Sequence, residues 1–263
     1  LIDGLEGLTN ERSGLLSAAP QAASSAYGWS VPRRLAYAQR LELDFAQGGS
    51  ALSSWQAAAH GIRAVYPQLA LSPHMELQPL GPDPRSGLWE FWHVASGAEP
   101  RRRASDGRIE IEADSALVFV LLPGGRFAMG AQAVDPASPN YDAVAEPHEF
   151  PVHDVELSAF FISKYEMTQG QWERLAGTNP SHYLDNPLVP WAAKPVEQVT
   201  WSDCRRVFDR LGLELPSEAQ WEYACRAGTS TPWWTGRDRE SLRTAHAANI
   251  ADASAARAGG TWQ

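Results

Sequence analysis

The stretch Leu215–Gly228, LPSEAQWEYACRAG, decides the fold more than any other part of this sequence. It begins with Ser217 followed by Gln220, which is the pattern of a capping box. In that pattern each side chain satisfies a backbone amide that the start of a helix leaves free. Gly228 then supplies a residue that ends a helix in the left-handed conformation. We therefore predict a short helix between Ser217 and Gly228.

The same start and stop chemistry occurs twice upstream. Thr168–Gly177 and Thr200–Gly212 each open with a threonine, continue with Gln or Asp three residues later, and end at a glycine. Loops rich in Pro and Asn separate these segments. Short helices on irregular loops and short strands predict an α+β domain with low regular secondary structure.

Apolar and alternating runs predict strands at Leu88–Val94, Arg108–Glu112, Ala116–Leu122, Arg126–Met129 and within Val152–Met167. The turn sequence Pro123–Gly125 predicts a hairpin between the third and fourth of these strands. We prefer the hairpin to a phosphate-binding loop, because no Gly-Lys-Ser/Thr follows the glycines.

The N-terminal part predicts two helices. Tyr37, Leu41 and Phe45 recur at helical spacing, and a second apolar stripe follows. The members of this second stripe are Leu52, Trp55, Ala59, Ile62 and Val65. The pattern changes after residue 115, so we expect a helical and small β linker region at 1–115 and the main domain at 116–263.

Composition excludes some functions. The 263 residues include 22 Lys and Arg against 31 Asp and Glu, a formal net charge of -9 that repels nucleic acid. The basic run Arg101–Arg103 is interpreted as a solvated turn. The longest apolar run, Ala116–Leu122, is too short to span a membrane. We expect a soluble chain; a cytoplasmic location is compatible with the lack of a signal peptide, but the compartment stays open.

The sequence contains two cysteines, Cys204 and Cys225. They could form a bridge, remain as two reduced thiols, or pair with residues beyond Gln263. Both fall in predicted helices, and we interpret both as buried structural cysteines, because free Cys is among the most buried residue types. We assign no catalytic residue in this chain.

Other candidate sites have simpler structural explanations. His148 and His153 lie among four acidic residues, but their spacing lacks a metal-binding helix, so we favour a hydrogen-bonded loop. Those acidic residues are Glu146, Glu149, Asp154 and Glu156. Trp172 and Trp221 each follow a capping glutamine, and we expect both in the core. An aromatic peptide-binding groove is considered only for Trp233 and Trp234.

Five ordered motifs together resemble the formylglycine-generating-enzyme (sulfatase-modifying-factor) family over about Val118–Gln263. The motifs are FAMG at 127–130, FFISKYEMTQGQW at 160–172, NPS at 179–181, PVEQVTWSD at 195–203 and LPSEAQWEYACRAGT at 215–229. The resemblance implies a loop-rich, C-type-lectin-like α+β fold.

The resemblance also implies a chemistry. Active members oxidise a cysteine of an unfolded sulfatase to formylglycine, using oxygen and copper held by a cysteine pair near the end of the domain. Neither Cys204 nor Cys225 matches that pair, and Cys225 is similar to a structural cysteine of some members. We therefore expect a C-terminally truncated, inactive domain, whose complete parent would hold copper and act on a sulfatase-like protein or peptide.

A structural calcium site is typical of the family. Ala248-Asn249-Ile250 resembles the start of such a site, in which the Asn249 side-chain oxygen and the Ile250 carbonyl are ligands. Oxygen donors of this kind suit Ca²⁺. The remaining ligands would lie past Ala251, so the expected site is partial.

Two alternative functions follow from related resemblances. GPDPRSGLWEFWHVASG at 81–97 resembles segments of bacterial proteins in which this domain is fused to a serine/threonine kinase. The domain would then be a silent recognition or regulatory module, with a kinase upstream of Leu1. An iron-dependent sulfoxide synthase shares the domain, but His60 and His74 do not supply its His-x-x-x-His-x-Glu triad.

Overall fold

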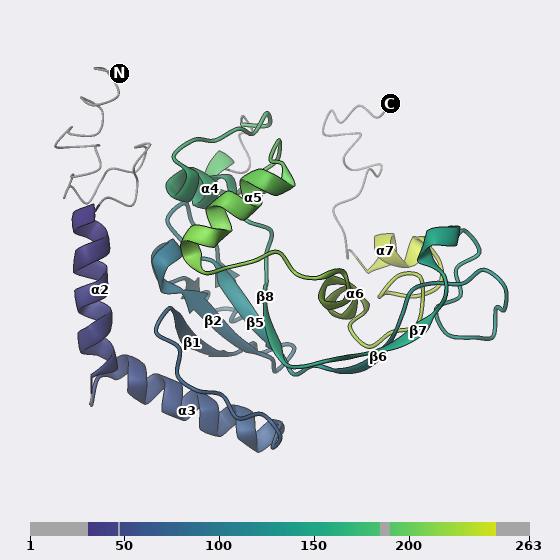
Figure 1. Cartoon of the computed structure of the whole chain (residues 1–263), viewed down its shortest axis with the longest axis horizontal. Coiled ribbons are helices and arrows are strands. Elements are labelled where there is room, and N and C mark those ends of the chain that lie inside the picture. The colour runs from purple at the N-terminus through teal and green to yellow at the C-terminus, as the bar shows by residue number, and fades with distance from the viewer. Residues whose placement is uncertain (1–30, 47, 185–189, 246–263) are drawn as a thin grey trace. The chain divides into compact units, whose positions relative to one another are not determined.

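The computed structural model describes residues 31–46, 48–184 and 190–245, and it combines helices with antiparallel strands (Figure 1). The chain divides into two compact units. The first unit comprises the residues up to Pro123 together with Ala159–Leu215, and the second comprises Gly124–Ser158 together with the residues from Pro216 onward.

The first unit is built on a four-stranded antiparallel sheet with the strand order β1-β2-β5-β8. Its strands are β1 (Leu77–Pro82), β2 (Trp89–His93), β5 (Val118–Leu122) and β8 (Phe160–Ser163), with the short pair β3 (Arg101–Arg102) and β4 (Ile109–Glu110). Its helices are α2 (Val31–Phe45), α3 (Ser50–Val65), α4 (Gln169–Ala176) and α5 (Trp201–Phe208). Short 3₁₀ turns are η1 (Val94–Ser96), η3 (Trp191–Ala193) and η4 (Asp209–Leu211).

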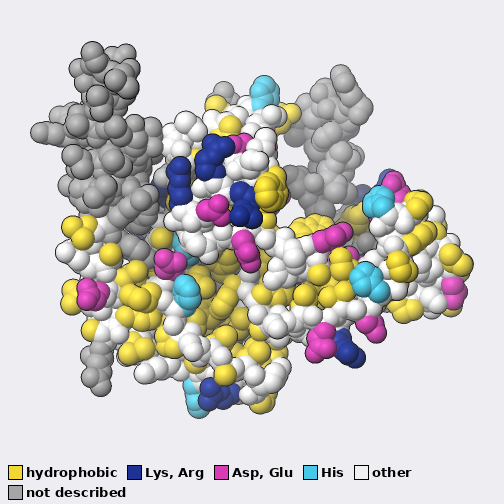
Figure 2. Space-filling view, viewed as in Figure 1, with side chains coloured by type: hydrophobic (Ala, Val, Ile, Leu, Met, Phe, Trp, Pro, Cys, Tyr) yellow, Lys and Arg dark blue, Asp and Glu magenta, His cyan; other side chains and the backbone are white. Residues whose placement is uncertain are grey.

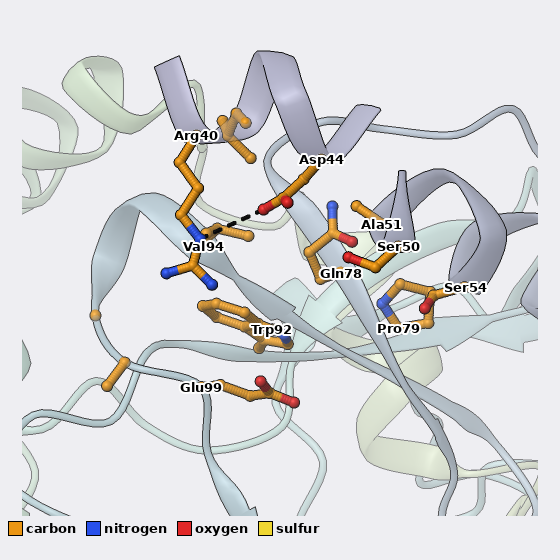
Figure 3. Close-up of a pocket in the computed structure, with 13 residues that line it drawn as sticks. Arg40, Asp44, Ser50, Ala51, Ser54, Gln78, Pro79, Trp92, Val94 and Glu99 are labelled. Carbon is orange, nitrogen blue, oxygen red and sulfur yellow. Dashed lines mark hydrogen bonds and ion pairs between the residues drawn. The ribbon is translucent and has the colours of Figure 1, made fainter. Parts of the chain in front are cut away.

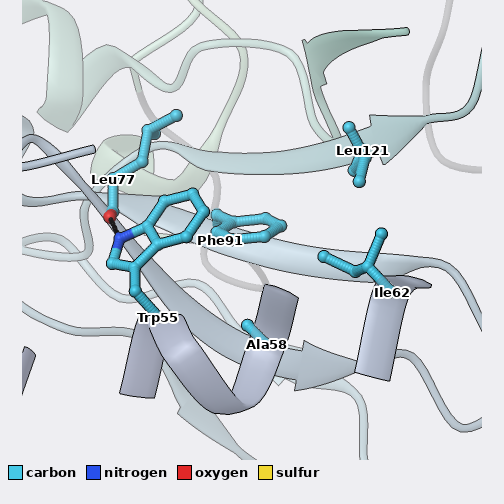
Figure 4. Close-up of a cluster of buried hydrophobic side chains, with 6 residues drawn as sticks. All are labelled: Trp55, Ala58, Ile62, Leu77, Phe91 and Leu121. Atoms are coloured by element: carbon cyan, nitrogen blue, oxygen red, sulfur yellow. Dashed lines mark hydrogen bonds between the residues drawn. The ribbon is translucent and has the colours of Figure 1, made fainter. Parts of the chain in front are cut away.

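The core of the first unit forms where α3 packs on the sheet (Figure 4). Trp55, Ala58 and Ile62 share one face of α3 and meet Phe91 of β2. The Trp55 indole also donates a hydrogen bond of 2.5 Å to the Leu77 carbonyl, so burial of the ring leaves no polar atom unsatisfied. Trp55 and Ile62 are thus buried as predicted.

Three members of the predicted stripe, Leu52, Ala59 and Val65, do not belong to the core. Ala58 is buried where Ala59 was expected, and Val65 is 63% exposed at the end of α3. Gly61 accounts for the close approach of the helix, because a Cβ atom there would lie 2.6 Å from the Trp89 ring.

All three predicted capping boxes are confirmed, at the starts of α4, α5 and α6 (Glu218–Arg226). Gly177 ends α4 in the left-handed conformation as predicted. After α5 the chain passes through η4 before Gly212 becomes left-handed, and after α6 Ala227 adopts that conformation before Gly228. The sequence therefore predicts the first residue of each of these helices, and it predicts the last residue to within about one helical turn.

The second unit contains the antiparallel pair β6 (Gly125–Met129) and β7 (His153–Leu157), the turn η2 (Pro147–Glu149), α6 and α7 (Glu240–Thr244). The predicted hairpin between Ala116–Leu122 and Arg126–Met129 is wrong. Strand β5 already has β2 on one side and β8 on the other, so neither edge is free, and β6 pairs with β7 instead.

The sheet of the first unit also bears on the predicted boundary after residue 115. Strands β1 and β2 lie before it and β5 and β8 after it, yet all four share one sheet. The family-like motifs begin after this boundary, and the division of the chain at 115/116 stays a prediction.

The face drawn in Figure 2 intersperses Lys and Arg with Asp and Glu side chains. Within residues 31–46, 48–184 and 190–245, none of the helices combines the length and apolar character that crossing a bilayer requires.

Ile62→Ala should lower the free energy of unfolding by about 2–5 kcal/mol, because it removes a fully buried side chain and leaves a cavity. Val65→Ala, on the same helix but exposed, should change it by less than about 0.5 kcal/mol. Urea denaturation of both variants measures the difference. Equal effects of the two substitutions would contradict the packing of α3 on the sheet.

Candidate functional site

In the second unit, two side chains of α6 hold the backbone of Gly130 from both sides. Glu222 Oε1 accepts a hydrogen bond of 2.9 Å from the Gly130 amide, and Arg226 Nη2 donates one of 2.8 Å to the Gly130 carbonyl. The pair is joined by a bond of 2.7 Å from Arg226 Nε to Glu222 Oε1. We call this arrangement the Gly130 clamp. It connects the FAMG motif to the LPSEAQWEYACRAG motif.

Gly130 suits the clamp because it has no side chain. Its φ of 91° lies in the left-handed region, and a Cβ atom would stand 2.6 Å from the Glu149 carbonyl oxygen. The buried Asn140 amide donates further bonds to the carbonyls of Ala128 and Gly130 at 2.7 and 2.8 Å. The Tyr223 hydroxyl donates to the Gly124 carbonyl at 2.6 Å. These side chains therefore hold the backbone of the segment from Gly124 to Gly130 in place.

The two cysteines are not the buried residues that we predicted. Cys204 on α5 is half-buried and Cys225 on α6 is exposed, and neither forms a disulfide. Burial and the neighbouring Asp203 carboxylate raise the pKa of the Cys204 thiol. The burial prediction failed because a residue type does not fix which face of a short amphipathic helix it occupies.

Neither of the two predicted calcium ligands is described by the structure, and the histidines that we interpreted as a hydrogen-bonded loop are described. Asn249 and Ile250 lie outside the described residues. His148 faces Glu146 at 3.5 Å, and His153 Nδ1 lies 2.9 Å from the Pro151 carbonyl, which agrees with a hydrogen-bonded loop. In the described part of the chain, no three His, Cys, Asp or Glu side chains are grouped so that they could hold a metal ion.

The tryptophans divide between core and surface. Trp172 is buried as predicted, whereas Trp221 is 59% exposed and the core prediction for it is wrong. Both follow a capping glutamine, but α6 buries none of its side chains fully. Trp233 and Trp234 are exposed, so their part in a peptide-binding groove stays a prediction.

A buried carboxylate organises the charged residues of the first unit. Glu90 of β2 is fully buried and accepts hydrogen bonds from Lys164 and, at 2.6 Å, from Arg102. Lys164 also donates to Asp83 at 2.9 Å. Although burial opposes it, these hydrogen bonds raise the pKa of Lys164. The interpretation of Arg101–Arg103 as a solvated turn is therefore wrong for Arg102, because a buried charge needs a paired partner.

A groove of about 460 Å³ lies in the first unit between α2, α3 and the strands β1 and β2 (Figure 3). Sequence analysis did not identify it. Its residues come from separate segments that only the fold brings together. The side chains that give it chemical character are Arg40, Asp44, Gln78, Trp92 and Glu99, with the Ser50 and Ser54 hydroxyls.

His93, at the end of β2, is buried with both ring nitrogens lacking a hydrogen-bond partner among the described residues. The Glu76 carboxylate lies 3.9 Å from Nε2, and His74 is also nearby. Burial, and to a smaller extent His74, lower the pKa of His93 to about 4. The imidazole is therefore neutral near pH 7.

Arg226→Ala should lower the free energy of unfolding by about 1–3 kcal/mol, because Glu222 and the Gly130 carbonyl lose a partner. Glu222→Ala should have a similar effect, and the double variant should cost less than the sum of the two. Arg126→Ala removes an exposed ion pair with Glu156 in the same unit and should change stability by less than about 0.5 kcal/mol. Additive effects in urea denaturation would exclude the clamp.

Because the pKa of His93 is lowered in the folded chain, we predict that the free energy of unfolding decreases at acid pH. Between about pH 6.5 and 4 the unfolded chain binds a proton on His93 that the native chain does not, so the free energy of unfolding falls as the pH is lowered. The slope from this group is at most about 1.4 kcal/mol per pH unit. His93→Leu should remove that part of the slope, and His60→Gln on the exposed side of α3 should not. Unfolding by urea at several pH values measures this, and equal slopes for wild type and His93→Leu would refute it.

Comparison with known proteins places these motifs in a family. Residues 108–261, which are 154 of the 263 residues, match the family model described as the sulfatase-modifying factor enzyme 1-like domain. The chain is 28% identical over 177 residues to a formylglycine-generating enzyme of Thermomonospora curvata, covering 50% of this chain and 56% of that protein.

The chain is also similar to part of a protein kinase and to a solved structure. The chain is 27% identical over 133 residues to the serine/threonine-protein kinase pkn1 of Chlamydia pneumoniae, covering 43% of this chain and 20% of the kinase. The solved structure of Treponema denticola variable protein 1 is similar with a TM-score of 0.40 and 21% identity, covering 51% of this chain and 61% of that one.

The chain spans about half the length of the formylglycine-generating enzymes of Thermomonospora curvata, Bos taurus and Mycobacterium tuberculosis that it matches. The family model nevertheless covers more than half of this chain, and it includes the Gly130 clamp and all three capped helices. The chain therefore belongs to the sulfatase-modifying factor enzyme 1-like family, and its fold is the loop-rich, C-type-lectin-like α+β fold of that family.

Proposed function

We propose that the chain is part of an oxidoreductase that converts a cysteine of a sulfatase-like protein to formylglycine. The observation that carries the proposal is the family match over residues 108–261, two of whose motifs meet at the Gly130 clamp. The similarity to the Thermomonospora curvata enzyme supports the same activity. In this proposal the described residues form the framework of the domain.

The copper that such an oxidation uses prefers soft thiolate ligands. The cysteines of this chain do not fit that role. The raised pKa of Cys204 disfavours its thiolate. Cys225 is an exposed free thiol in the last turn of α6. We therefore assign the copper-binding pair to a complete parent protein and no catalytic step to this chain. Calcium, with Asn249 and Ile250 as two ligands, remains part of the proposal.

A second function is favoured by one observation. The match to a serine/threonine-protein kinase of Chlamydia pneumoniae suggests that this domain also serves in kinase-associated proteins. There it would act as a recognition or regulatory module without redox chemistry, with a polypeptide as its partner. Family membership alone does not decide between the two, because related domains can differ in the site that carries function.

The 263-residue chain, supplied with copper(I) and oxygen, should not convert the cysteine of a sulfatase-motif peptide to formylglycine above a protein-free control. The reason is that neither Cys204 nor Cys225 fits the role of a copper-binding thiolate. Mass spectrometry of the peptide measures conversion, and the Thermomonospora curvata enzyme serves as the positive control. Turnover by this chain that disappears in Cys204→Ser or Cys225→Ser would overturn the proposal for those residues.

The same assay on the product of the full native reading frame separates the two functions. Conversion of the peptide by that product would support the oxidoreductase. Peptide binding without conversion, in the presence of copper, would favour the recognition module.

A further inference from the structure

The groove of Figure 3 belongs to a part of the chain that the family model does not include. Its lining residues run from Arg40 to Glu99, whereas the family match begins at residue 108. A ligand of this groove would therefore reflect the chain's own N-terminal region. The groove is independent of the chemistry proposed for the family domain.

Gln78 gives the groove an acceptor without a partner. The residue is only 9% exposed, and its Nε2 donates a hydrogen bond of 3.2 Å to the Met75 carbonyl. Because a carbonyl only accepts, this bond fixes which end of the amide is nitrogen. The opposite end, Oε1, receives no hydrogen bond from any described residue. This oxygen is not among the buried polar atoms that lack a partner, so solvent reaches it and it is open to a hydrogen-bond donor in the groove.

The charge of the groove is negative. Glu99 forms no ion pair within the described residues, and Asp44 is paired only with Arg40, at 3.4 Å along α2. The Arg40 side chain is 84% exposed, so this pair sits at the rim and is weak. Two carboxylates against one exposed guanidinium leave an excess of one negative charge, which favours a cationic ligand.

Trp92 supplies an aromatic wall. It lies directly opposite Gln78 in the ladder between β1 and β2, so both side chains emerge on the same face of the sheet. Figure 3 shows the indole between Arg40 on one side and Glu99 on the other. The face of an indole attracts ammonium and guanidinium groups.

We propose that this groove binds the side chain of an arginine or lysine in a polypeptide segment. The cation would lie against Trp92, with Glu99 as its counter-ion and Gln78 Oε1 as a hydrogen-bond acceptor. The volume exceeds that of one side chain, which leaves room for adjoining backbone. The Ser50 and Ser54 hydroxyls, which have no side-chain hydrogen bond to a described residue, can bond peptide groups of the segment. This inference goes beyond the proposed function.

The test is an NMR titration. The 263-residue chain carries ¹⁵N-labelled tryptophan, and N-acetyl-arginine-N-methylamide is added to it in steps. The Trp92 indole signal, assigned with Trp92→Phe, should shift and saturate. The citrulline analogue has the same shape without the charge and should produce no saturable shift. Glu99→Gln should weaken the binding of the arginine compound about two- to fivefold, as expected for an exposed ion pair.

Two variants provide matched controls. Glu42→Gln changes the same charge on the exposed side of α2, outside the groove, and should leave the affinity unchanged. Arg40→Ala removes the competing cation and should tighten binding about two- to fivefold.

Three results would overturn the proposal. The first is an equal shift with the citrulline compound, which would remove the role of charge. The second is an equal loss in Glu99→Gln and Glu42→Gln, which would show a general effect of net charge. The third is equally tight binding of propylguanidinium, which has no peptide groups and would identify a small-cation site instead of a polypeptide site.

Discussion

The hold of Glu222 and Arg226 on Gly130 is the interaction on which the second unit depends. It fixes both polar groups of one residue from 92 and 96 positions away in the sequence. Because Gly130 follows the last residue of β6, the clamp sets where the β6–β7 ladder ends relative to α6. Tyr223, from the same turn of α6, reaches the other end of β6 at Gly124. The residues of the LPSEAQWEYACRAG motif thus act on backbone positions that the sequence keeps far apart.

Features that depend on neighbouring residues could be predicted from the sequence. The capping boxes of α4, α5 and α6 are formed by side chains three residues apart, so their chemistry is local and their positions were confirmed. Strand pairing is not local. The Gly124-Gly125 pair is a plausible hairpin turn, but the sequence does not show that β5 lies in the middle of a sheet with both edges occupied.

The candidate site was harder to predict than the fold, for a related reason. Cys225 was expected in the core because of its residue type and Trp221 because it follows a capping glutamine, yet α6 exposes both. A helix of nine residues carries few positions, and its periodicity does not settle which face is covered. The groove near Trp92 could not be predicted either, since it is lined from α2, α3, β1, β2 and the segment after β2. The one signal in the sequence was Glu99, an acidic residue close to an aromatic strand.

In the first unit, the segment that precedes the family match is joined to the family domain. Strands β1 and β2 precede the family match but pair into the same sheet as β5 and β8, and Glu90 joins Arg102 to Lys164 across that region. The additional segment is therefore anchored to the domain by hydrogen bonds and buried charge. The groove proposed to bind a cationic side chain lies in this anchored segment, outside the family motifs.

The most direct test of this account is hydrogen exchange at the Gly130 amide. The clamp predicts that this amide is protected as strongly as the paired amides of β6 and β7, because Glu222 accepts its hydrogen bond in a partly buried setting. It also predicts that Glu222→Ala removes the protection while the β6–β7 ladder stays protected. Exchange of Gly130 at the rate of an exposed loop amide in the unaltered chain would contradict the account.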